Sequence, residues 1–119
     1  MIEPKRQSDI SALVPYVRDR VKAILAELED LGFDPMVFEA RRSDERQKWL
    51  YGIGRTHSLD RKPVSWTLKS KHISGKAVDI ISKSKMWIHP KFFAALKKVS
   101  KKYGMHTLKK EACHIEWQG

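Results

Sequence analysis

The chain has 119 residues, of which 41% are hydrophobic and 32% charged, and its formal net charge is +10. This composition supplies one hydrophobic core, so it excludes a disordered chain and predicts a single domain over residues 1–119. No apolar run approaches the roughly 20 residues of a membrane span, the N-terminus lacks the apolar stretch of a secretory signal, and the single cysteine excludes an intramolecular disulfide.

Helix and strand signals alternate along the first third of the chain. A turn of helix is expected over residues 8–13. Pro15 suits the first turn of a longer helix, because its missing N–H group has no partner in a first turn. The apolar stripe of that helix runs to Leu31, and Gly32 is expected to end it. Met36–Glu39 is rich in β-formers and predicts a short strand.

Ser43 is expected to be the N-cap of a helix over residues 44–53, which Gly54 ends. The later expected elements are a loop over residues 55–69, a strand over Ala77–Ser82, a helix from Pro90 to Gly104 and a strand over Cys113–Trp117. Helices mixed with short strands in this order predict an α+β domain with a small, mostly antiparallel sheet flanked by helices.

One histidine stands just before the expected strand that carries Asp79. Gly75 lies between His72 and that aspartate, where it allows the backbone to turn sharply. An aspartate inside an otherwise apolar strand is costly unless its charge is compensated, and a divalent metal ion compensates it.

The last strand carries a second histidine. Alternation along a strand points Cys113, Ile115 and Trp117 to one face, which is apolar and expected in the core. The same alternation points His114 and Glu116 to the opposite face, where we expect a cleft.

Together His72, Asp79 and His114 form a set of two histidines and one carboxylate for one zinc ion. Three protein ligands leave the fourth position open, as in catalytic zinc sites. Zinc lowers the pKa of its bound water to about 7, and a nearby carboxylate can take the proton. Glu111 is the candidate general base, and Glu116 the candidate to orient a ligand or the base. Spacing alone leaves open that these histidines are surface or core residues.

These residues resemble the signature of the VanY-type D-Ala-D-Ala carboxypeptidase family, which includes the phage-endolysin L-alanyl-D-glutamate peptidases. An upstream "RS…Q…LY…GRT" segment between Arg42 and Thr56 resembles that family too, and the match covers residues 36–117. The motifs are Ser70-x-His72, Gly75-x-Ala77-x-Asp79 and Glu111-x-x-His114-x-Glu116. The resemblance implies the zinc D,D-peptidase fold, also called hedgehog/D,D-peptidase-like, with zinc on the three residues above and Glu111 as the base.

The resemblance also implies a role for Arg42, which binds substrate or stabilises the oxyanion. Ser70 is expected to hydrogen-bond near the metal and contact substrate. Trp66 either lines the substrate groove or caps the core, and Gln47 is either a substrate contact or a residue of the helix face. The segment before Glu111 is short and lacks the Gly- and Trp-rich insertion of many relatives, which lowers one wall of the cleft.

The implied function is a zinc metallopeptidase that cleaves peptidoglycan stem peptides. The L-Ala–D-Glu bond is preferred because the chain is minimal and carries the GRT block. A D-Ala-D-Ala carboxypeptidase shares every zinc residue and is the first alternative. From other classes, a basic nucleic-acid-binding domain with a structural metal and a zinc-binding module without catalysis remain open. No helix-turn-helix, zinc-finger or RNA-stacking motif supports the former, and Glu111 argues against the latter.

The charge and the absence of a signal lead to the last expectations. The basic stretch between Lys97 and Lys102 is either a solvated helix face or a weak attachment to anionic murein or membrane. We expect a monomer that is made in the cytoplasm and acts in the periplasm after holin-type release, as in phage lysis.

Overall fold

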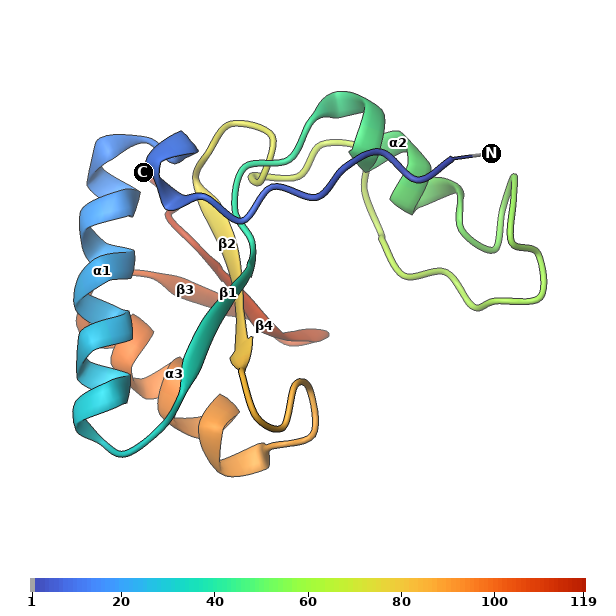
Figure 1. The fold of residues 1–119 in the computed structure, drawn as a ribbon. Coiled ribbons are helices and arrows are strands. Elements are labelled where there is room, and N and C mark those ends of the chain that lie inside the picture. The colour runs from blue at the N-terminus through green and yellow to red at the C-terminus, as the bar shows by residue number, and fades with distance from the viewer. Residues whose placement is uncertain (1) are drawn as a thin grey trace.

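The computed structural model describes residues 2–119 and contains three α-helices and a four-stranded sheet (Figure 1). A 3₁₀ turn over Ile10–Ala12 leads into α1 (Pro15–Asp30), which begins with its proline as predicted. One apolar stripe of α1 is buried, namely Val17, Val21, Ile24 and Leu28. Gly32 follows the helix with a φ of 91°, a conformation that glycine adopts without strain.

The sheet has the order β1-β2-β4-β3, and all neighbouring strands are antiparallel. Its strands are β1 (Pro35–Glu39), β2 (Ala77–Ser82), β3 (His106–Leu108) and β4 (Glu111–Glu116). The predicted α+β architecture is confirmed. β3 was not predicted, because three residues are too few to show an alternating pattern. β4 starts two residues earlier than expected and ends one residue earlier.

Helices α1 and α3 (Pro90–Lys102) cover one face of the sheet and form the core with it (Figure 1). The sheet contributes alternate apolar residues to this core, with Val78 and Ile80 from β2 and Ile115 from β4. We call α1, α3 and the four strands the body. None of the helices formed by residues 2–119 is long and apolar enough to cross a membrane.

Helix α2 (Asp44–Gly52) and the long loop after it extend away from α1 and α3 (Figure 1). We call residues 43–76 the wing. Ser43 caps α2 as predicted, since its side chain accepts a hydrogen bond from the backbone N–H of Arg46. The buried residues of α2 are Arg46, Gln47 and Gly52, so this helix is held mainly by polar contacts.

The register of the strands places three polar residues in a row on the sheet face opposite α1 and α3. Asp79 of β2 lies directly opposite Glu39 of β1 on one side and opposite His114 of β4 on the other. Since cross-strand partners point to the same face, this row forms the floor of the candidate site.

Candidate metal centre

His72, Asp79 and His114 bring one donor atom each to a common point, and these atoms all lie within 4.8 Å of one another. The Oδ1 atom of Asp79 is 3.1 Å from Nε2 of His72 and 3.4 Å from Nδ1 of His114. The strand pairing supplies the aspartate and the second histidine, and the end of the wing supplies the first. Gly75 makes the predicted turn between the wing and β2 with a φ of 73°.

The second nitrogen of each imidazole ring is already engaged within the protein. Nδ1 of His72 lies 2.8 Å from the carbonyl oxygen of Ala40, and Nε2 of His114 lies 2.8 Å from a carboxylate oxygen of Glu116. Since these oxygens accept hydrogen bonds, the engaged nitrogens carry the protons. When both rings are neutral, the nitrogens beside Asp79 have free lone pairs and can bind a metal ion; when a ring is protonated, that nitrogen can instead donate to the carboxylate. Two imidazole nitrogens and a carboxylate oxygen suit a zinc ion, so the donor set fits the expected metal.

Electrostatics keep the aspartate ionised. Burial raises the pKa of Asp79, but hydrogen bonds from His114 and His72 outweigh burial and hold that pKa well below its usual range. Burial lowers the pKa of His114, and the neighbouring Asp79 more than reverses this, so the pKa of His114 is raised. A bound cation would replace the proton that this imidazole otherwise gains beside the carboxylate.

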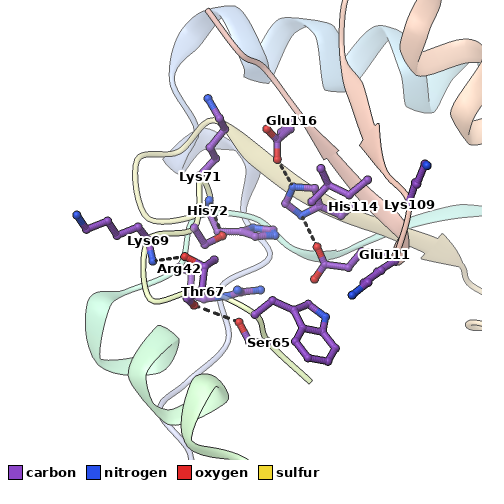
Figure 2. Close-up of a pocket in the computed structure, with 14 residues that line it drawn as sticks. Arg42, Ser65, Thr67, Lys69, Lys71, His72, Lys109, Glu111, His114 and Glu116 are labelled. Carbon is purple, nitrogen blue, oxygen red and sulfur yellow. Dashed lines mark hydrogen bonds and ion pairs between the residues drawn. The ribbon is translucent and has the colours of Figure 1, made fainter. Parts of the chain in front are cut away.

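Glu111 lies at the edge of the same site, at the start of β4 (Figure 2). Its Oε2 atom is 4.0 Å from Nδ1 of His114, and its side chain is 38% exposed. It is therefore close to the candidate metal position without being one of the three converging donors. Glu116 lies on the other side of the His114 ring, buried and hydrogen-bonded to it (Figure 2).

Arg42 lies beside the aspartate and is fixed by two acceptors. Its Nη2 atom donates to Oε1 of Glu39 over 2.7 Å, and its Nη1 atom donates to the side-chain oxygen of Gln47 over 2.6 Å. Nη2 is also 3.6 Å from Oδ2 of Asp79. Both the arginine and Glu39 are largely buried, so the guanidinium has a defined position next to the candidate metal ligands.

The sequence analysis did not predict the residues that hold this arginine. Glu39 is 2% exposed and also accepts a hydrogen bond from Nε of Arg46 over 2.5 Å. Gln47 is 1% exposed, and its amide nitrogen donates to Oγ of Ser65 and to the carbonyl oxygen of Thr67. Both ends of the Gln47 amide are thus engaged within the protein. Asp79 stands inside its apolar strand, whereas Glu39 is the last residue of β1, so no comparable signal in the sequence indicated its burial.

A cavity of about 530 Å³ opens in front of these residues, and Arg42, His72, Glu111 and His114 are among those that line it (Figure 2). Trp66 also lines it and is 58% exposed, so this ring is part of the cleft wall and does not cap the core.

Ser70 lines the cleft too, and its hydroxyl accepts a hydrogen bond from the backbone N–H of His72. Cys113 was expected in the core but lies outside it. Its side chain is half-buried outside the main core cluster, because the pairing of β3 with β4 is irregular there and interrupts the alternation. Burial raises the pKa of its thiol to about 12.

No protein-family model matches the chain, and no curated protein matches its sequence. Solved structures do match it. A structure of the LdcB LD-carboxypeptidase aligns with a TM-score of 0.71 and 20% identity over 99% of this chain, which spans 64% of the length of that one. VanYB in complex with D-alanine-D-alanine aligns with a TM-score of 0.73 and 14% identity, covering 99% of this chain and 79% of that one.

The L-Ala D-Glu endopeptidase ChiX of Serratia marcescens aligns with a TM-score of 0.63 and 20% identity, covering 98% of this chain and 89% of that one. This chain has the VanY-like peptidase fold. The fold class expected from the sequence is thus confirmed, while identities of 14–20% leave the chemistry to be argued from the site itself.

Proposed function

We propose that this chain is a zinc-dependent peptidase that cleaves peptidoglycan stem peptides at the L-Ala–D-Glu bond. The observation that carries the proposal is the convergence of His72, Asp79 and His114 beside Glu111 and Arg42 in one open cleft. A second similar VanY structure, which aligns with a TM-score of 0.71 and 15% identity over 90% of this chain and 73% of that one, is in complex with Zn(II). The LdcB structure reveals the molecular basis of peptidoglycan recognition. The choice of bond is supported by the likeness to ChiX, an L-Ala D-Glu endopeptidase.

The residues around the candidate metal position each have a task in peptide hydrolysis. One zinc ion, when bound, supplies a Lewis acid that polarises the scissile carbonyl. Glu111 accepts a proton from the attacking water and delivers it to the leaving nitrogen. The guanidinium of Arg42 faces the negative charge that develops on the carbonyl oxygen. Glu116 keeps the His114 ring in the tautomer that ligates metal.

The remaining predicted site residues, Ser70 and Trp66, lie on the cleft wall where a bound peptide passes. Trp66 offers an apolar face to the substrate, and Ser70 offers a hydroxyl beside His72. We assign both to substrate binding.

Mass spectrometry of digested murein tests the proposal. Purified Gram-negative murein is incubated with the zinc-loaded protein, with and without a chelator. Release of stem peptides with a new N-terminal D-Glu, lost in the presence of chelator, is the expected result. Loss of one terminal D-Ala would instead establish the carboxypeptidase that the VanYB likeness favours. No new product with zinc bound would refute both.

Replacing Glu111 with Gln is expected to lower kcat by about 10²–10⁴-fold, the usual contribution of a general acid–base group, without loss of zinc. Glu111→Asp keeps the carboxylate and is expected to retain measurable turnover. Glu29→Gln, an exposed change on α1, serves as the matched control. A fully active Glu111→Gln protein would show that another group is the base. A role in phage lysis stays a prediction.

A further inference from the structure

The mouth of the cleft carries four lysines that the reaction described above does not use. Lys69 and Lys71 flank Ser70 just before His72, and Lys109 and Lys110 form the turn between β3 and β4 just before Glu111. Figure 2 shows Lys69 and Lys71 on one side of the candidate metal centre and Lys109 on the other. We call these four residues the lysine rim.

The charge of the rim is not compensated by the protein. Among residues 2–119, no carboxylate lies within 4.0 Å of any of the four ammonium groups. Inside the cleft, Arg42 is paired with Glu39, and Glu116 is engaged by His114. The rim therefore presents a surplus of positive charge around the site, which favours anionic groups on a bound peptide.

Lys110 is the residue of the rim that contacts Trp66. Its Nζ atom lies 4.7 Å from the centre of the Trp66 ring, so the turn between β3 and β4 meets the wing across the cleft. Together with Lys109 it directly precedes Glu111, the group that hands a proton to the leaving nitrogen. The residue that carries this nitrogen must lie on the Glu111 side of the cleft, next to Lys109 and Lys110.

We propose that Lys109 and Lys110 bind a free α-carboxylate on the residue that leaves, and that the lysine rim thereby selects anionic stem peptides. This inference rests on the proposed peptidase function. In a stem peptide, D-Glu is joined to the next residue through its γ-carboxyl group, so its α-carboxylate stands one carbon from the scissile nitrogen. Amidation of this group to D-isoglutamine removes the charge without altering the bond that is cut. A terminal D-Ala carries an α-carboxylate in the same position.

A pair of synthetic pentapeptide stems tests whether the enzyme recognises the α-carboxylate of D-Glu. One contains D-isoglutamate and the other D-isoglutamine, and kcat/KM of the zinc-loaded full chain is measured for each. We expect the amidated stem to be cut about tenfold more slowly at the L-Ala–D-Glu bond, the size of one charge-assisted hydrogen bond. The preference should shrink as salt is added. The double variant Lys109→Gln, Lys110→Gln should lose the preference, while Lys22→Gln on α1 should keep it.

Equal rates on the two stems would overturn the inference and leave the proposed function standing. An equal loss of kcat/KM on both stems in the double variant would also overturn it, since the lysines would then contribute without binding the α-carboxylate. Removal of terminal D-Ala alone would refute the proposed bond, and a stem ending in D-Ala amide would then test the same lysines. If no bond is cut, the affinity of each stem for the zinc-loaded Glu111→Gln protein is measured by calorimetry. Equal affinities for the two stems would overturn the inference.

Discussion

The body and the wing are held by different kinds of contact. In the body, helices α1 and α3 bury apolar side chains against alternate residues of the sheet, such as Phe92 and Leu96 of α3. In the wing, α2 instead buries an arginine and a glutamine, and its attachment to β1 runs through the carboxylate of Glu39. Apolar burial is nondirectional, whereas charge-assisted hydrogen bonds fix the orientation of the groups that they join.

The candidate metal centre lies where these two regions meet. Asp79 and His114 come from strands of the body, and His72 comes from the end of the wing. Arg42 lies between β1 and α2. The core thus supplies two of the candidate ligands, backbone groups of Ala40 and Arg42 hold the third, and the polar network around Glu39 positions the arginine. Variants in the two regions are therefore expected to affect different properties.

The largest expected effect on stability is in the body. Leu96 is fully buried between α3 and the sheet, so Leu96→Ala should lower the free energy of unfolding by about 2–5 kcal/mol, as measured by urea denaturation. Leu59→Ala in the wing, where the side chain is 72% exposed, is the matched control and should change it by less than about 0.5 kcal/mol. A similar loss in both variants would contradict the division into body and wing.

Zinc should join the two regions. At a free concentration of about 100 times its Kd, zinc is expected to raise the free energy of unfolding by about 2.7 kcal/mol. Because His72 belongs to the wing, hydrogen exchange should slow around this residue as well as in β2 and β4. Protection confined to the body would show that His72 is not a ligand. His72→Gln is expected to weaken the stabilisation.

A smaller loss of stability, with a larger loss of activity, is expected where the wing joins β1. Glu39→Gln removes the charge that Arg42 and Arg46 share, at a cost of about 1–3 kcal/mol for a buried group that loses its partner. Hydrogen exchange in α2 should accelerate more than in α1, and kcat should fall because Arg42 loses its fixed position. Uniform exchange with an unchanged kcat would show that the network does not orient the arginine.

The smallest effect on stability is expected from removing an exposed ion pair in the body. Glu27 of α1 accepts hydrogen bonds from Lys102 and Tyr103, and the bond from Lys102 lowers its pKa. A lowered folded-state pKa means that this contribution is present at neutral pH and is lost as the pH falls below about 4.5. Glu27→Gln should therefore be slightly less stable than the parent at pH 7 and equally stable near pH 2, as acid titration followed by circular dichroism can show.

Local signals predicted much of the fold and the donor set. Pro15 at the start of α1 and the Ser43 cap of α2 were predicted because a proline or a capping hydroxyl acts on the residues next to it. Asp79 stood out because an isolated charge in an apolar strand requires a partner. His114 followed from strand alternation, which holds at that end of β4.

The contacts that hold Arg42 depend on distance in space, which a single sequence does not show. Gln47 meets Thr67 across the wing, and Arg46 meets Glu3 from the start of the chain. The irregular pairing of β3 and β4 could not be predicted either, because it depends on how the short β3 aligns with the longer β4.

The wing also has a consequence for how this fold tolerates change. Because β1 and β2 are neighbours in the sheet, residues 40–76 form one long excursion that leaves the sheet at Glu39 and returns at Ala77. The entropy of closing such a loop grows only slowly, by about 0.6 kcal/mol for each doubling of its length. The loop can therefore be lengthened or shortened between Gly54 and Val64, ahead of the wing residues that line the cleft, while the body still folds.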